Sequence, residues 1–390
     1  MFLIGAGKAS KAMAFAMEEL IGDSLTSGVI ISKTKSATAS IKIEELTGGH
    51  PVPDQSSLDG TRKLMSQIQN LTQSDLVFCL ISGGGSALMA APANGISLLE
   101  MQQLVRILLG CGATIHEINT IRKHIDRVKG GGLAKIIYPA QCVTLLLSDV
   151  VGNSIDVIAS GPTVPDETSY EDAEQVINKH GIREKIPRSI LEVLREGRAG
   201  LLPETLKVDD PRYERVQNVI IGSNQQAAEA AVVQAKLEGF DGQLLTTYLQ
   251  GESRLAGEFL STIMHQMAVH NQPVRRPACL VVGGETTVVL KNHGKGGRNQ
   301  ELALSSVEVI AGLDRVTLVT LATDGEDGPT DAAGAVVTGE TAARAAQTGL
   351  SDRSYLDQNN SYEFFEKLGD LIKIGPTGTN VNDLDFLFTF

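Results

Sequence analysis

Residues 75–89 read DLVFCLISGGGSALM, an apolar run that ends in three consecutive glycines. A run without polar alternation is typical of a strand buried on both faces of a sheet. Similar runs recur at 2–4, 28–32, 143–149, 218–223, 243–249 and 279–284. Stretches with helical spacing of apolar residues lie between them, at 8–20, 97–109 and 225–240. The pattern predicts an α/β protein whose parallel sheet is covered by helices on both faces.

The length of 390 residues exceeds what one hydrophobic core usually serves, which predicts two α/β domains. A second series of strand, helix and loop begins near residue 278. We therefore expect a first domain at 1–240 and a second at 277–388. Residues 181–215 carry arginines, prolines and alternating charge, and we expect a less ordered, insert-like region there.

Acidic residues outnumber basic ones by 46 to 34, and no block of lysine and arginine stands out, so nucleic acid is not an expected partner. No apolar run approaches the ~20 residues of a membrane span, and no signal peptide is recognisable. The four cysteines lie singly in apolar surroundings, which indicates reduced core residues. These features predict a cytoplasmic protein without a membrane partner, either a monomer or a homodimer.

Ligands of parallel α/β sheets gather at the carboxyl ends of the strands, and several polar residues fall at such ends. Lys8, in GAGKAS at 5–10, follows the first strand and opens a helix, which suits an anion, although the motif matches neither a Walker A loop nor a dinucleotide fingerprint. The loop SGGGS at 82–86 offers successive glycine N–H groups between two hydroxyls, an arrangement that suits a phosphate.

Two further residues of this half are candidates. Asp149 closes a buried strand and could be a base, a metal ligand or a turn cap. His50, which precedes a proline, could position a substrate hydroxyl, but a lone histidine is also commonly structural. The charged side chains between 116 and 134 are expected to face solvent for the most part.

Two loops of the C-terminal half combine cations with acids. The stretch 283–302 contains Lys295 and Arg298 among glycines, a combination that binds oxyanions. The stretch 322–334 contains four acids, whose hard oxygens suit Mg²⁺ that also holds phosphates. Each loop alone would also fit a solvated turn, but together they predict a phosphoryl-transfer site. The loop 375–384 adds threonine and asparagine side chains that can hydrogen-bond a polar ligand.

In order along the chain, these loops resemble those of the glycerate 2-kinase family with its C-terminal MOFRL domain, and the match spans almost the whole chain. The resemblance implies an N-terminal Rossmann-like parallel sheet, a smaller C-terminal α/β domain, and a substrate site in the cleft between them. It also implies that ATP, with Mg²⁺, phosphorylates D-glycerate at its 2-hydroxyl group.

The resemblance implies specific roles for residues of this sequence. By the resemblance, Lys8 and Arg298 are the leading catalytic residues, and we expect Asp149 to be catalytic as well. The residues that we expect to bind substrate or phosphate are Ser82, Gly83, Gly84, Gly85, Ser86, His50, Glu285, Asn299, Thr379 and Asn380. We expect Asp324 and Asp327 to be the metal ligands, with Asp149 and Glu285 as alternatives for the metal and base roles.

Two alternatives stay open at this point. Proteins of this type have also been labelled hydroxypyruvate reductases, but the sequence lacks the GxGxxG fingerprint that a nicotinamide cofactor normally requires. Members of the family usually have some tens of residues, including a helix, ahead of the GAGKA strand. We therefore expect the first strand to lack cover on one face, which would favour a binding module without catalysis.

Overall fold

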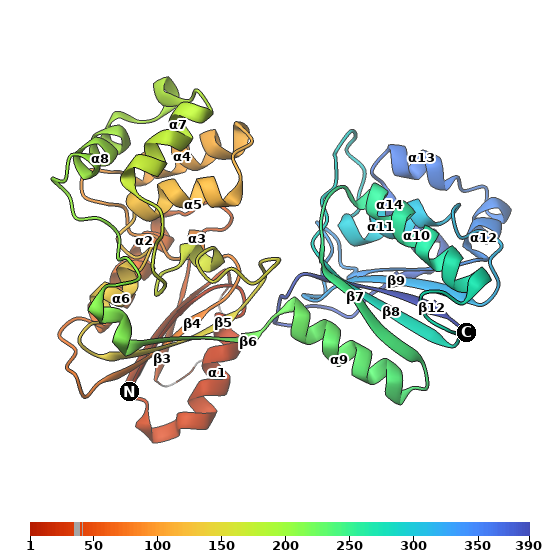
Figure 1. Ribbon diagram of the computed structural model, residues 1–390, viewed down its shortest axis with the longest axis horizontal. Coiled ribbons are helices and arrows are strands. Elements are labelled where there is room, and N and C mark those ends of the chain that lie inside the picture. The colour runs from red at the N-terminus through yellow and green to blue at the C-terminus, as the bar shows by residue number, and fades with distance from the viewer. Residues whose placement is uncertain (35–39, 41) are drawn as a thin grey trace. The chain divides into compact units, whose positions relative to one another are not determined.

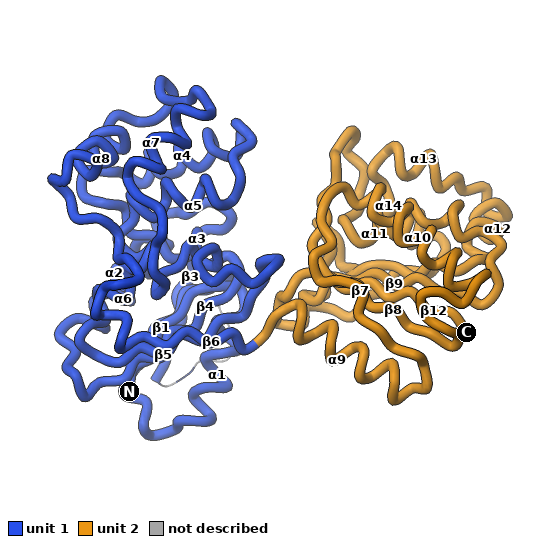
Figure 2. Tube along the Cα trace, in the orientation of Figure 1, with its two compact units in different colours: residues 1–221 blue, residues 222–390 orange. Residues whose placement is uncertain are grey.

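The computed structural model describes residues 1–34, 40 and 42–390. The chain forms two compact units, residues 1–221 and 222–390 (Figure 2). Each unit has its own sheet and its own hydrophobic core.

The boundary between the two units, after residue 221, lies earlier in the chain than the end of the first domain that we expected at residue 240. Residues 222–240, which we assigned to the first domain, lie in the second unit and contain the whole of helix α9 (Asn224–Leu237). The next strand, β7 (Asp241–Leu249), pairs in parallel with β8 (Ala278–Gly284). Helix α9 packs on both of these strands, so it belongs with the second sheet.

Unit 1 contains a six-stranded sheet with the order β3-β2-β1-β4-β5-β6 (Figure 1). Its strands are β1 (Phe2–Ala6), β2 (Ser27–Ser32), β3 (Ile43–Thr47), β4 (Leu76–Ile81), β5 (Gln141–Leu147) and β6 (Val216–Gly222). The pairs from β3 to β5 are parallel, which confirms the predicted parallel sheet. The strand order reverses between β1 and β4, the place where sheets of this type bind ligands.

Helices cover both faces of this sheet. The helices of unit 1 are α1 (Ser10–Ile21), α2 (Gln55–Gln67), α3 (Gly85–Leu88), α4 (Leu98–Gly110), α5 (Ile115–His124), α6 (Gly132–Ile137), α7 (Tyr170–Lys179) and α8 (Arg188–Arg198). Several begin with a capping box, as in α4, where Ser97 and Glu100 satisfy each other's backbone N–H groups.

The first strand is covered on both faces, contrary to our expectation. Leu3 packs with Met13 of α1, whereas its neighbour Ile4 packs with Leu64 of α2 and Leu133 of α6. Successive side chains of a strand point to opposite faces, so α1 covers one face and α2 and α6 cover the other. Leu3 and Ile4 are both fully buried as a result.

A separate layer of helices, α4, α5, α7 and α8, has its own core (Figure 1). The expectation of a less ordered region at 181–215 is wrong over α8. Ile190 and Leu194, one turn apart on this helix, are completely buried against the other three helices.

Unit 2 contains a mixed sheet with the order β11-β10-β9-β12-β8-β7. The remaining strands are β9 (Val316–Ala322), β10 (Gly334–Thr338), β11 (Leu371–Ile372) and β12 (Asp383–Thr389). Only β7 and β8 are parallel among the pairs of this sheet that the structure describes. Residues 323–333 connect β9 to its antiparallel neighbour β10 without a helix, and β12 inserts antiparallel between β8 and β9.

Helix α9 covers one face of this sheet, and the other helices cover the opposite face (Figure 1). These other helices are α10 (Ser253–His270), α11 (Arg298–Ser306), α12 (Thr341–Gln347), α13 (Asp352–Asp357) and α14 (Ser361–Leu368). Helix α11 is buried on all sides from Asn299 to Ser306, so it is the central helix of the unit.

Replacing Phe365 tests the contribution of this core to stability. Its side chain is fully buried and stacks edge-on against Phe364 at 5.2 Å between ring centroids. We expect Phe365→Ala to lower the free energy of unfolding of unit 2 by about 3–5 kcal/mol, because it removes buried area and leaves a cavity. Denaturant titration measures the loss. Phe259→Ala, at a phenylalanine that is 60% exposed on α10, is the control, and an equal loss there would contradict the assignment.

All four cysteines are free thiols, with Cys79, Cys142 and Cys279 buried and Cys111 partly exposed. In the part of the chain that the structure describes, no helix is both long enough and apolar enough to cross a membrane.

Candidate functional site

The first group of candidate residues lies where β1, β3, β4 and β5 end. Lys8 follows β1, and its backbone N–H donates to the carbonyl of Gly83, after β4, at 2.9 Å. The next backbone N–H, of Ala9, donates to Ser82 Oγ, also at 2.9 Å. These two bonds fix the turn into α1 against the glycine loop, and the Lys8 side chain remains exposed.

The glycine loop lets two functional side chains approach its backbone. A Cβ atom on Gly83 would lie 1.8 Å from Oδ2 of Asp149, and one on Gly84 would lie 2.9 Å from the ring of His50 and 3.6 Å from Cγ of Lys8. Gly84 also has a φ of +81°, which other residues rarely adopt. The structure therefore brings Lys8, His50 and Asp149 together around Gly83 and Gly84, as the sequence predicted only in outline.

The surroundings of Asp149 and His50 shift the pKa values of both side chains. Burial raises the pKa of the Asp149 carboxyl above its ordinary value, and the positive charge of Lys8 opposes this rise only in part. Burial, together with the charges of Lys8 and Lys33, lowers the pKa of His50, so its imidazole is neutral at pH 7. A carboxylate that favours a proton and a neutral imidazole are both suited to accept one.

The N–H and hydroxyl groups of the predicted phosphate loop differ in whether they already have a hydrogen-bond partner. Among the described residues, the N–H groups of Gly83 and Gly84 have no acceptor and are available to an anion. The N–H of Gly85 already donates to the carbonyl of Ser82, and the hydroxyl of Ser86 lies 2.6 Å from that of Ser160. Two of the predicted donors are thus free, whereas the hydroxyl groups stabilise the loop.

The second group of candidates lies at the end of β8 and the start of β12, in unit 2. The guanidinium of Arg298 donates to both carboxylate oxygens of Asp383, from Nε at 2.5 Å and from Nη2 at 3.0 Å. Its Nη1 lies 3.0 Å from Oε1 of Glu285. Burial acts to lower the pKa of Arg298, but Asp383 and Glu285 raise it beyond its ordinary value. The arginine is therefore permanently charged and held in one orientation.

Asp327 accepts hydrogen bonds from backbone N–H groups at the start of α11, next to Arg298. Its Oδ1 accepts from the N–H of Asn299 at 3.2 Å, and its Oδ2 accepts from the N–H of Gln300 at 2.9 Å. The side chain of Asn299 also donates to Asp327, at 3.3 Å, and both side chains are buried. Asp327 and Asn299 thus fix the first turn of α11, at whose first position Arg298 stands, and Asp327 fits a metal-ligand role poorly.

Asp327 also predicts a pH dependence of stability. Burial raises its pKa from 3.8 to about 6, although the N–H groups of α11 act to lower it. A carboxyl group with a raised pKa in the folded state stabilises the fold fully below its unfolded pKa, and this contribution is lost as pH rises through about 6. We expect the group to account for roughly 3 kcal/mol of lost unfolding free energy between about pH 4 and pH 7.

Asp327→Asn is expected to remove this component, measured by denaturant titration at several pH values. Asp314→Asn, at an exposed aspartate of the same unit, is the control and should keep the pH dependence of the parent protein. An unchanged pH dependence in Asp327→Asn would show that other carboxyl groups are responsible.

The predicted residues of the last loop lie beside the acid-rich loop. Thr377 donates from its backbone N–H to the carbonyl of Asp324 at 3.0 Å, and the N–H of Val381 donates to Thr323 Oγ1 at 2.9 Å. Thr379 is partly exposed here, whereas Asn380 is buried and accepts from the N–H of Asn382.

The sequence reasoning missed Asp383, which is the main partner of Arg298. The signal was present in the loop 375–384, where Asp383 begins the last strand, but only uncharged side chains were considered there. Asn224 was missed as well, and its Nδ2 donates to the carbonyls of Val381 and Asp383 at 2.8 and 2.9 Å. Lys295 does not join Arg298: its ammonium lies over the ring of Tyr362, at 3.7 Å from the ring centroid.

The expectation that the charges between 116 and 134 face solvent is wrong for the central ones. Lys123, His124 and Lys129 are 3–4% exposed. Lys129 donates to Asp126 at 2.8 Å and Lys123 donates to Asp166 at 3.3 Å, so each buried charge has a counter-charge.

Within the described residues, no three His, Cys, Asp or Glu side chains are arranged as a metal site. Mg²⁺ often uses only one or two protein carboxylates together with phosphate oxygens and waters. Asp324 fits such a role, because its carboxylate is partly exposed and close enough to Asp383 to raise the pKa of that group.

Family models and a curated relative match this chain over most of its length. Residues 1–195 match a family described as a domain of unknown function, DUF4147, and residues 278–383 match the MOFRL family. A D-glycerate 2-kinase of Thermotoga maritima is 43% identical over 98% of this chain and 89% of its own length. The chain belongs to the glycerate kinase family. The family's DUF4147 and MOFRL segments fall in unit 1 and unit 2, respectively.

Two further comparisons are informative. The crystal structure of a glycerate kinase from Thermotoga maritima matches with a TM-score of 0.93 and 42% identity, over all of this chain and 91% of that chain. A protein of Agrobacterium vitis named putative hydroxypyruvate reductase is 39% identical over 98% of this chain and 85% of its own length.

Proposed function

We propose that this glycerate kinase family member transfers the γ-phosphoryl group of ATP to the 2-hydroxyl group of D-glycerate, giving 2-phosphoglycerate and ADP. The observation that carries the proposal is the group formed by Lys8, His50 and Asp149 around the free N–H groups of Gly83 and Gly84. It combines an exposed cation, oxyanion donors and a proton acceptor at the point where the strand order reverses.

Lys8 and the two N–H groups bind the transferring phosphoryl group. Phosphoryl transfer requires mainly positioning and neutralisation of charge on the equatorial oxygens. Lys8 supplies the charge, and the backbone hydrogen bond between Lys8 and Gly83 keeps the lysine beside the glycine N–H groups. These donors stabilise the charge most strongly in the transition state.

Asp149 accepts the proton of the attacking hydroxyl group. The 2-oxygen of glycerate forms a bond to the γ-phosphorus as the bond between that phosphorus and the bridging oxygen of ADP breaks. The hydroxyl proton passes to the Asp149 carboxylate, whose raised pKa favours acceptance. His50, neutral and adjacent to Gly84, orients the hydroxyl group.

In unit 2, Arg298 neutralises the substrate carboxylate or the charge of the transferring group. Among the described residues, Asp383 accepts from two of its five N–H donors and Glu285 lies beside a third, so the other two can bind a ligand. Asp324 would hold Mg²⁺ together with phosphate oxygens, and the ion would neutralise phosphate charge when bound. The free cysteines suit a reducing compartment, and we place the reaction in the cytoplasm.

A coupled assay tests the proposal. Purified protein is supplied with D-glycerate, ATP and Mg²⁺, and the product is passed directly to enolase, which accepts only the 2-phosphate. A parallel assay uses hydroxypyruvate with reduced nicotinamide cofactors, because a relative carries the name of a reductase. Immediate enolase turnover is expected. Activity in the reductase assay alone would overturn the proposal.

A further inference from the structure

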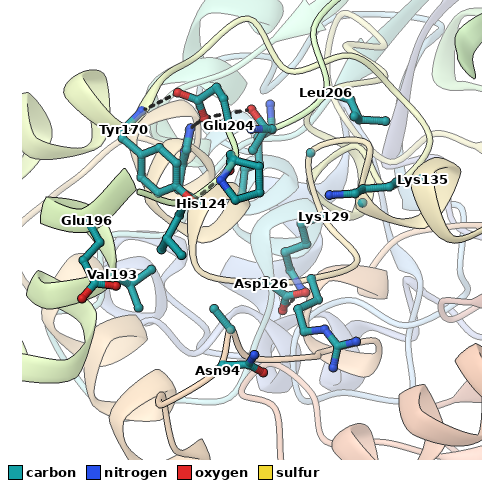
Figure 3. Close-up of a pocket in the computed structure, with 18 of the residues that line it drawn as sticks. Asn94, His124, Asp126, Lys129, Lys135, Tyr170, Val193, Glu196, Glu204 and Leu206 are labelled. Carbon is teal, nitrogen blue, oxygen red and sulfur yellow. Dashed lines mark hydrogen bonds and ion pairs between the residues drawn. The ribbon is translucent and has the colours of Figure 1, made fainter. Parts of the chain in front are cut away.

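Unit 1 contains a cavity of about 700 Å³ that has no role in the proposed reaction (Figure 3). It lies among the end of α5 and its following turn, helix α6, the first residue of α7, helix α8 and the segment 202–206. Its volume falls within the roughly 300–1,000 Å³ that small-molecule sites usually have. Lys8, His50, Gly83 and Asp149 do not line it.

The walls of the cavity are largely apolar. Tyr170 and Val193 form one side in Figure 3, and Leu206 lies toward the opposite side. The ring of Tyr170 lies against that of His124, with 4.7 Å between ring centroids, which fixes the orientation of both rings. A rigid aromatic wall of this kind suits a planar or apolar ligand body.

A buried polar group also lines the cavity. His124 is 3% exposed, and its Nδ1 donates to the carbonyl of Thr120 at 2.7 Å. Its Nε2 lies 2.9 Å from Oε1 of Glu204 but has no hydrogen bond of good geometry among the described residues. Burial acts to raise the pKa of Glu204, but His124 and the N–H of Thr205 lower it to about 2, so the carboxylate is ionised. A buried nitrogen with incomplete bonding is unusual unless a ligand or water completes it.

The lining of the cavity carries slightly more basic than acidic side chains, whereas the whole protein carries a formal charge of −12. Lysine and arginine outnumber aspartate and glutamate by four to three in its lining. Lys123 and Lys129 are buried and paired with aspartates. Arg127 and Lys135 are exposed and have no ion-pair partner within the described residues. These two cations are therefore available to an anionic ligand.

We propose that this cavity binds a small organic anion, a phosphate or carboxylate carried on a planar apolar body, at a site separate from the phosphoryl-transfer residues. Arg127 and Lys135 bind the anionic group, and the apolar body packs against Tyr170 and Val193. Neither cation has a role in the proposed reaction, so binding here and turnover can be measured independently.

Two fluorescent probes test the proposal on the full chain: 1-naphthyl phosphate and 1-naphthoate. The protein contains no tryptophan, so naphthyl emission can be followed with little interference. We expect saturable binding of at least one probe with one site per chain, whereas inorganic phosphate alone competes weakly. The probe that binds more tightly identifies whether the anionic group is a phosphate or a carboxylate.

Variants separate this site from other modes of binding. Arg127→Glu and Lys135→Glu should each raise the Kd about tenfold or more. Arg106→Glu, at an exposed arginine of α4, is the matched control and should leave the Kd unchanged. All three should keep the thermal melting temperature and kcat of the parent protein.

Lys8→Ala should keep probe binding, which distinguishes the two sites even if the proposed kinase reaction is wrong. The proposal is overturned if neither probe saturates, if the two charge reversals leave the Kd unchanged, or if Lys8→Ala abolishes binding.

Discussion

Replacing Lys8 with alanine is expected to lower kcat by about 10²–10³-fold with D-glycerate and ATP, because the variant loses the cation beside the transferring phosphoryl group. The loss should appear mainly in kcat, since the charge that Lys8 stabilises is greatest in the transition state. The enolase-coupled assay at saturating substrates measures it. Lys8 is exposed and only its backbone N–H bonds to Gly83, so the fold should be unaffected.

Lys11→Ala is the matched control. Lys11 lies in the first turn of α1, three residues after Lys8, and its ammonium is 3.9 Å from the carboxylate of Glu45. Its replacement should leave kcat within about twofold, because surface ion pairs contribute little. If Lys8→Ala retained nearly full turnover, or if both variants lost it equally, Lys8 would have no specific role in the transfer.

Asp149→Asn is expected to lower kcat by about 10²–10⁴-fold, the usual contribution of a general base. Asparagine has nearly the same shape and keeps the contact with Gly83, so the change tests the proton acceptor rather than packing. Circular dichroism should show an unchanged fold. Turnover close to that of the parent enzyme would remove Asp149 from the mechanism.

The pH profile separates Asp149 from His50. The base must be deprotonated to work, so activity should fall as pH decreases through the pKa of the group that accepts the proton. Burial places the pKa of Asp149 above its ordinary value and that of His50 below its ordinary value. The acidic limb should disappear in Asp149→Asn and persist in His50→Asn. The reverse result would assign the base role to His50.

Much of the site is visible in the sequence because its residues follow strands directly. Lys8, Asp149 and the glycine loop were found from buried apolar runs, whose carboxyl ends meet at one edge of a parallel sheet. Arg298 and the acid-rich loop were found from their composition. Asp383 was missed because only the uncharged side chains of the loop 375–384 were considered, and its position beside Arg298 depends on the antiparallel pairing of β12.

The amino-acid sequence determined the local elements of this protein: buried strands, capped helices and glycine turns, each of which depends on residues within a few positions of one another. Tertiary structure alone decided which distant charges meet. Arg298 and Asp383 are 85 positions apart, and their pairing depends on β12 inserting between β8 and β9. Likewise, the acid-rich loop predicted Asp327 as a metal ligand, whereas packing directs its carboxylate to the N–H groups of Asn299 and Gln300 in α11. Spacing along a chain specifies periodicity, whereas burial and long-range pairing arise only when the sheets assemble.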